Sequence, residues 1–359
     1  MKNDYSLNIL GGYSLGTRKI EVGGVLNINR SETGKLQLAG LANFVGGKVS
    51  GIQMAGLTNL NQKGFKGIQS AGFLNMNQDS CKGIQLAGFL NLNKCTMEGF
   101  QAAGFANINA ASEQGVMLSG FSNMNKGNYT GVQAAGFGNS HKGGFYGVQA
   151  SGFYNSTKGS FEGLQLAGFL NYAQTIKGVQ IAFINFSDSC KGVPIGFFNY
   201  VKSGYHRLEL ATDEQLNIHI SLRSGTQQFY TLLAATSQVT SLQGKKDIWS
   251  FGYGLGTAFQ VGKKMQVNLD LIAHQYALGN SLALNQNYGN LLLNLDYRIA
   301  KRISIFVGPV LNVALLTPSD TKNYTTLSNN VPSYAKTDNL TTSHQLRYWL
   351  GGKCGIRFL

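Results

Sequence analysis

Residues 83–93 read Gly-Ile-Gln-Leu-Ala-Gly-Phe-Leu-Asn-Leu-Asn, and variants of this stretch return every 16 residues through the first half of the chain. The central glycine recurs at 24, 40, 56, 72, 88, 104, 120, 136, 152 and 168, and an asparagine follows three residues after each. A fixed period of this kind indicates structural units that cannot bury an apolar face alone and stack on their neighbours.

The repeat alternates like a β-strand. Even-numbered residues such as Ile84 and Leu90 fall on one face, and odd-numbered residues such as Gln85, Phe89 and Asn91 fall on the other. A tilted strand of about 9 to 11 residues crosses a bilayer, and the alternating stretch has this length. Each unit therefore fits one membrane strand followed by a short turn.

The stretch is also nearly palindromic about Gly88, because Leu86 mirrors Leu90 and Gln85 mirrors Asn91. This symmetry favours an antiparallel meander, in which one sequence serves both upward and downward strands. A parallel β-solenoid is the alternative. In it each 16-residue coil folds into two short strands, which explains the unbroken register and stacks Phe and Asn as ladders.

Composition restricts the class of protein. Only 13% of the 359 residues are charged while 43% are hydrophobic, which is unusual for a soluble domain. No segment approaches the roughly 18 consecutive apolar residues of a spanning helix, so any insertion into a bilayer must use strands. The amino terminus lacks the apolar stretch of a secretory signal, and we expect a mature or truncated form of an exported protein.

The net charge of +14 invites a nucleic-acid interpretation, but the cations are dispersed between repeats, as Lys63, Lys82, Lys126 and Lys142 illustrate. We expect solvated turn lysines, or attraction to anionic lipid or polysaccharide, and no nucleic-acid partner. The 4 cysteines are scattered without metal-ligand spacing, so neither a metal site nor a cofactor is expected.

Beyond residue 205 the repeat stops, but alternation continues: Leu269 and Leu271 oppose Asn268 and Asp270. The connections at 261–264 and 300–302 are short, whereas those at 277–288 and 317–343 are long. Short turns on one side and long loops on the other are typical of outer-membrane barrels. The last strand ends near Phe358, like the terminal signal of such barrels.

The repeat, the segment 202–210 (Lys-Ser-Gly-Tyr-His-Arg-Leu-Glu-Leu) and the segment 253–257 (Tyr-Gly-Leu-Gly-Thr) resemble outer-membrane surface-repeat β-barrel proteins of Bacteroidota. The resemblance covers nearly the whole chain. In longer relatives this barrel region follows a carboxypeptidase-regulatory-like domain, and similar repeats occur in spirochaete surface proteins. The resemblance implies a fold and a location in the bacterial outer membrane, but no reaction.

These patterns together predict an all-β protein. We expect one antiparallel up-and-down transmembrane β-barrel over residues 1–359 with about 20 strands, its repeat-built wall at 19–201 and its non-repeat strands at 205–359. Its expected role is a porin-like channel or an envelope and surface scaffold subunit. The alternative is a surface-exposed solenoid used for adhesion or binding, followed by a small C-terminal barrel anchor.

In a barrel the odd-numbered face lines the lumen. The amides there form either a self-satisfying network or a polar path for solutes, and the phenylalanines conflict with a simple water-filled pore. Expected partners are outer-membrane lipid and lipopolysaccharide, a periplasmic plug or other envelope proteins, and saccharides that stack on aromatic rings. The lumen-lining candidates are Gln53, Gln69, Gln85, Gln101, Gln133, Gln149, Gln165, Asn59, Asn75, Asn91, Asn107, Asn123, Phe73, Phe89, Phe105, Phe121 and Phe137.

Catalysis has weak support in the sequence. Asp270 and His274 share one polar face and His219 points inward by the same count, but nothing places a serine nucleophile beside them. We therefore expect no enzyme and assign no catalytic residue.

Overall fold

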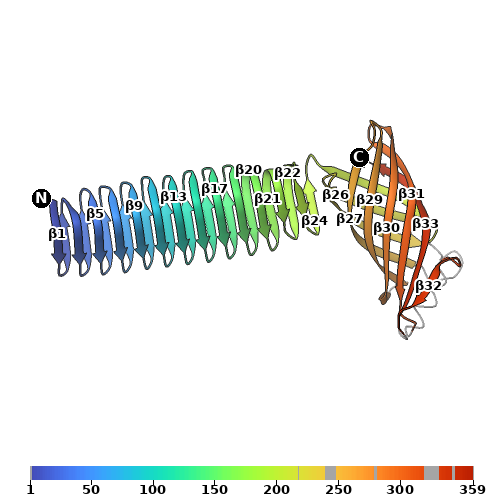
Figure 1. Cartoon of the computed structure of the whole chain (residues 1–359), viewed down its shortest axis with the longest axis horizontal. Coiled ribbons are helices and arrows are strands. Elements are labelled where there is room, and N and C mark those ends of the chain that lie inside the picture. The colour runs from blue at the N-terminus through green and yellow to red at the C-terminus, as the bar shows by residue number, and fades with distance from the viewer. Residues whose placement is uncertain are drawn as a thin grey trace. The chain divides into compact units, whose positions relative to one another are not determined.

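The structure, a computed structural model, describes residues 2–216, 218–238, 248–278, 281–318, 331–341 and 344–358. Every regular element among these residues is a strand. The chain divides into two compact units, residues 1–195 and 196–359 (Figure 1). The first is a parallel β-solenoid and the second contains a closed antiparallel barrel. The single barrel of about 20 strands is therefore wrong, and the alternative of a solenoid followed by a small barrel fits.

Each 16-residue unit of the solenoid forms one coil with a long strand and a short strand. The long strands are β1 (Lys2–Asn8), β3 (Gly16–Gly23), β5 (Thr33–Ala39), β7 (Val49–Ala55), β9 (Phe65–Ala71), β11 (Cys81–Ala87), β13 (Met97–Ala103), β15 (Glu113–Ser119), β17 (Tyr129–Ala135) and β19 (Phe145–Ser151). The short strands are β2 (Gly11–Ser14), β4 (Leu26–Asn29), β6 (Ala42–Val45), β8 (Thr58–Asn61), β10 (Leu74–Asn77), β12 (Leu90–Asn93), β14 (Ala106–Asn109), β16 (Ser122–Asn125) and β18 (Gly138–His141).

Further along, a short strand runs on into the next long strand in β20 (Tyr154–Ala167) and β21 (Leu170–Ile181). The unit ends with β22 (Ile184–Cys190) and β23 (Val193–Ile195). Strands pair in parallel with the strand one coil away, so that Gln85 lies beside Gln101 and Asn91 beside Asn107. A parallel stack aligns identical side chains in ladders, which the meander does not.

The turn at Gly88 explains why one alternating stretch becomes two strands. The chain turns at Gly88 and Phe89 between β11 and β12, and a Cβ on Gly88 would lie 2.0 Å from the carbonyl oxygen of Gly72 in the preceding coil. Only glycine allows this approach. The palindrome has a new meaning here, because the two strands of a coil face each other and both place amides inward and aliphatic side chains outward.

The second unit begins with β24 (Phe198–Val201) and continues with the barrel. The barrel strands are β25 (Tyr205–Asp213), β26 (Ile218–Gly225), β27 (Tyr230–Gln238), β28 (Ile248–Gln260), β29 (Met265–Leu278), β30 (Ser281–Ala300), β31 (Ile303–Leu316) and β33 (Gln345–Phe358), with β32 (Lys336–Asn339) paired to β33. Neighbours are antiparallel, and β25 pairs with β33, which closes the barrel.

The expected alternating strands after residue 205 are confirmed in β29 and β30. The long connection expected at 277–288 is wrong, because β29 extends to Leu278 and β30 begins at Ser281. Strand pairing extends past the point where the sequence suggests a loop, and joins Ala277 to Leu282. Of the other long connection, residues 319–330, 342 and 343 lie outside the described residues.

Candidate functional site

Three ladders of amide side chains fill the solenoid interior. The side-chain amide of Asn91 donates to Oδ1 of Asn107 (2.9 Å) and to the carbonyl oxygen of Ala102 (2.8 Å). Gln101 donates in the opposite direction along the chain, to Oε1 of Gln85 (2.6 Å). The third ladder contains Asn93. Its side-chain amide donates to Oε1 of Gln85 at 2.8 Å, which links this ladder to the glutamine ladder. Each buried amide thus finds partners inside the stack.

The predicted lumen-lining amides all lie in this interior and are fully buried. They lie between the two sheets of the solenoid rather than along a barrel lumen. With their donors and acceptors engaged by neighbouring coils, they have the character of a self-satisfying network. They are Gln53, Gln69, Gln85, Gln101, Gln133, Gln149, Gln165, Asn59, Asn75, Asn91, Asn107 and Asn123.

The predicted phenylalanines do not share this interior. Phe73, Phe89, Phe105, Phe121 and Phe137 are between 39% and 47% exposed, at the turn that joins each long strand to its short strand. Successive rings stack at centroid distances near 5 Å, for example 4.8 Å between Phe89 and Phe105. The faces of these rings cover one another, so the row presents ring edges outward. Between these five rings no aromatic face is left free for a saccharide to stack on.

The first position of each long strand breaks the uniformity of the interior. It holds Met97, Glu113, Tyr129 and Phe145 in successive coils. Burial raises the pKa of Glu113 to about 8, although hydrogen bonds from Asn109 and Asn125 favour the ionised form. At His141, which occupies an asparagine position, burial lowers the pKa to about 4.

Over most of the solenoid, the exposed charges are confined to one edge. We count each 16-residue repeat from the first residue of its long strand, for example from Cys81. Between residues 51 and 186, Lys, Arg, Asp and Glu then fall only in the last three and the first two positions of a repeat, as Lys94 and Lys82 do. The stretch from the first glycine to the last asparagine, 83–93 in one coil, carries none. Lys82 and Glu98 pair across two coils at 2.8 Å on this edge. We name it the charged edge, and the opposite turn with Gly88 and Phe89 the aromatic edge.

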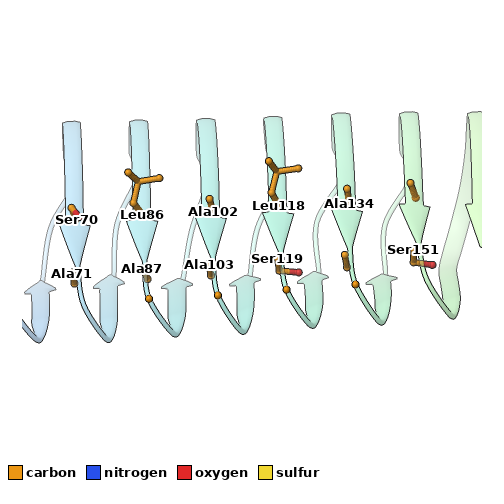
Figure 2. Close-up of a pocket in the computed structure, with 16 residues that line it drawn as sticks. Ser70, Ala71, Leu86, Ala87, Ala102, Ala103, Leu118, Ser119, Ala134 and Ser151 are labelled. Atoms are coloured by element: carbon orange, nitrogen blue, oxygen red, sulfur yellow. The ribbon is translucent and has the colours of Figure 1, made fainter.

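A shallow groove follows the carboxyl ends of the long strands. It has a volume of about 780 Å³ and is lined mainly by alanine, glycine and serine (Figure 2). Along the row, Leu86 projects between the smaller Ser70 and Ala102, and Leu118 projects between Ala102 and Ala134. The groove belongs to the uncharged surface beside the aromatic edge, and sequence analysis missed it because the repeat varies at this position.

The barrel interior holds a balanced charge cluster. Glu209 lies 2.6 Å from Nη2 of Arg223 and 2.8 Å from Nε of Arg357, and pairs with Lys353 at 2.9 Å. Two further carboxylates complete the cluster: Asp270 accepts from Arg223 at 2.7 Å and Asp296 from Arg357 at 2.8 Å. Three cations thus meet three carboxylates, with Arg223, Arg357 and Glu209 fully buried. Such groups persist in an interior only when paired.

The residues weighed for catalysis are not brought together as a hydrolytic site. Asp270 is engaged by Arg223 and by the hydroxyl of Tyr230 (2.6 Å). His274 instead contacts Ser250 (Nδ1 to Oγ 3.1 Å), and His219 pairs with Asp213 at 3.0 Å. Because Ser250 is buried and also hydrogen-bonded to Thr236, its hydroxyl does not face a substrate. The alternation placed these histidines inward, but it carried no signal for Ser250.

Comparison with known proteins gives no relative. No family model matches the chain, and no curated protein and no solved structure is significantly similar to it. In the described part of the chain, no helix has the length and apolar character needed to cross a bilayer. Over the same residues, no cluster of His, Cys, Asp and Glu has an arrangement suited to a metal ion.

Proposed function

We propose that this chain is a surface protein of the bacterial outer membrane, of the Bacteroidota surface-repeat kind, in which the barrel of residues 205–358 is the membrane anchor and the solenoid is a scaffold that contacts other envelope components. The role is structural and adhesive rather than catalytic.

The anchor is supported by one observation: the barrel has its charges inside and its large apolar side chains outside. Leu208 and Leu210 on β25 are 45% and 44% exposed, while Glu209 between them is fully buried. The same inversion recurs on β29, where exposed Leu269 and Leu271 flank buried Asp270. In water an outer wall of this kind would be costly, since each exposed leucine forgoes about 2 kcal/mol of burial. In a bilayer it is the required polarity.

An open channel has little support. Barrels of about eight strands are just wide enough for their own side chains to fill the interior. Here the charge cluster around Glu209 occupies that space, with Tyr205 and Tyr230 stacked at 4.9 Å. The porin-like expectation depended on a much larger lumen.

Gel mobility and detergent dependence test the anchor on the full chain. We expect the chain to need detergent for solubility and to migrate faster on a denaturing gel when unheated than when boiled, because folded membrane barrels resist the detergent. In planar bilayers we expect no conductance steps. A monodisperse chain in plain buffer, with one gel mobility, would contradict the anchor; steady conductance would contradict the filled interior.

A matched pair of variants locates the membrane-facing wall. Leu293 is 50% exposed on β30, and Leu293→Arg places a charge where lipid is proposed, at a cost of about 2 to 4 kcal/mol near the bilayer midplane. Tyr334 is 62% exposed outside the barrel strands, and Tyr334→Arg serves as the control. Folding into lipid vesicles, followed by the gel shift, should be weakened by the first change and not by the second.

A further inference from the structure

The uncharged surface of the solenoid covers three of its sides. On the long-strand face Ile84 and Leu86 are 39% and 37% exposed, and on the aromatic edge Phe89 is 39% exposed. The short-strand face continues this surface with the partly exposed Leu90 and Leu92. The same positions are apolar in most coils, and between residues 51 and 186 the exposed charges lie only on the fourth side, at the charged edge.

We propose that this surface is immersed in the hydrocarbon of one bilayer leaflet, with the charged edge at the level of the lipid headgroups. The occupant of the surface is thus lipid, and the solenoid is itself a membrane-embedded element, separate from the barrel anchor. This proposal does not depend on the function proposed for the barrel.

The size of the surface supports lipid over a single protein partner. Coils stack about 4.8 Å apart, so nine coils extend about 40 Å; the contour from Ile84 to Leu92 adds about 30 Å in the other direction. The product, about 1,200 Å², exceeds the roughly 800 Å² that each partner buries in a standard interface. It also wraps around an edge, whereas a second copy of the chain docking face to face would cover only one side.

The depth of the surface also suits a leaflet. From Ile84 to Phe89 the chain advances about 17 Å at roughly 3.3 Å per residue. Half of the roughly 30 Å hydrocarbon core is about 15 Å. With the aromatic edge near the bilayer centre, Lys82 and Lys94 therefore reach the headgroups, where amines meet anionic lipid.

Lipid requires that main-chain polar groups be paired, and the turns at the aromatic edge meet this requirement through hydrogen bonds between coils. At the aromatic edge the amide of Leu90 donates to the carbonyl oxygen of Phe73 (2.9 Å), and that of Gly88 to Ala71 (3.0 Å). Hydrogen bonds between coils thus continue through the turn itself. The polar side chains of this region, such as Asn91, point into the amide ladders.

Tryptophan fluorescence on the full chain tests the proposal. The native tryptophans, Trp249 and Trp349, both lie beyond the solenoid, so a tryptophan added there gives a signal by difference from the unmodified chain. Phe89→Trp places the probe on the aromatic edge, and Thr130→Trp places it on an exposed site of the charged edge. The chain is reconstituted in phosphatidylethanolamine and phosphatidylglycerol vesicles whose acyl chains are brominated near their middle.

We expect bromine to quench more than half of the added emission of Phe89→Trp and little of that of Thr130→Trp. Emission from Phe89→Trp that is as solvent-exposed as that of Thr130→Trp would overturn the proposal. Blue-shifted emission without quenching would overturn it in favour of a protein partner or a second copy. Phe121→Trp repeats the measurement should Phe89→Trp fail to fold. The heat-dependent gel shift reports on the barrel independently, so failure of one proposal leaves the other standing.

Discussion

The side-chain amide of Asn125 donates a hydrogen bond to the carboxyl group of Glu113 (3.1 Å) at the one level of the glutamine ladder where Met117 replaces glutamine. In other coils the equivalent asparagine donates to that glutamine, as Asn93 does to Gln85. Met117 offers no amide oxygen, and Glu113 supplies the missing acceptor to Asn109 as well as to Asn125. The substitution of one ladder residue is thus compensated by another in the same coil.

This compensation predicts a pH dependence of stability. Burial raises the pKa of Glu113 from 4.5 to about 8, so the folded chain holds a proton that the unfolded chain releases. The free energy of unfolding should therefore fall as the pH rises from 4.5 to 8, by up to roughly 5 kcal/mol from this group. Glu113→Gln should remove this decline, as measured by hydrogen exchange of solenoid amides across the pH range. An unchanged pH profile in that variant would count against a buried neutral carboxyl group.

The second titrating group, His141, should lower the stability of the solenoid at acid pH. Burial lowers the pKa of His141 from 6.5 to about 4, so the folded chain keeps it neutral while the unfolded chain takes up a proton. Stability should fall as the pH decreases from 6.5 through 4, by up to about 3 kcal/mol. His141→Asn, which restores the usual ladder residue, should flatten this acid limb in the same exchange experiment. If the unmodified chain and His141→Asn lost stability equally as the pH falls, His141 would not be the group responsible.

The ladders should be sensitive to single deletions. Asn91→Ala removes an acceptor from Asn75 and a donor from Asn107 and Ala102. Each buried group left unpaired costs about 1 to 3 kcal/mol, so we expect a loss of about 3 kcal/mol or more. Urea unfolding of the full chain, followed by hydrogen exchange of neighbouring coils, measures it. Lys94→Ala on the charged edge is the control and should change stability by less than about 0.5 kcal/mol.

The barrel cluster should depend on its most connected carboxylate. Glu209→Gln keeps the shape of the side chain but leaves Arg223, Lys353 and Arg357 facing two carboxylates. Breaking a buried pair in this way costs about 3 to 5 kcal/mol. We expect the temperature at which the unheated gel band disappears to fall clearly. Exposed Lys301 provides the comparison, and Lys301→Gln should leave that temperature unchanged.

The sequence predicts which residues form strands better than it predicts how those strands pair. The period, the strands and the barrel after residue 205 follow from alternation, which is a local property. The parallel pairing does not, because the inward and outward alternation of 83–93 is equally compatible with one long strand and with two strands joined at Gly88. The position of Phe89 distinguishes one long strand from two short ones. Alternation along one strand places Phe89 inside with Gln85, whereas the turn places it outside.

Part of the candidate site can also be predicted from the sequence. The Gln and Asn rows are evident from their spacing, and their mutual hydrogen bonding was one of two interpretations. The uncharged surface can also be predicted from the sequence, because the positions of Lys82 and Lys94 within the repeat mark its two limits. The pairing of Glu209 with Arg223, Lys353 and Arg357 cannot, because closure of the barrel joins residues far apart in the chain.

The identical register of successive coils makes the number of repeats adjustable. Each coil presents to the next the surface that it receives from the one before, as Gln69, Gln85 and Gln101 illustrate. Deletion or duplication of a 16-residue segment such as 83–98 would therefore join two compatible surfaces and leave every ladder continuous. Recombination between repeats could vary the reach of this protein in steps of one coil without any new fold having to evolve.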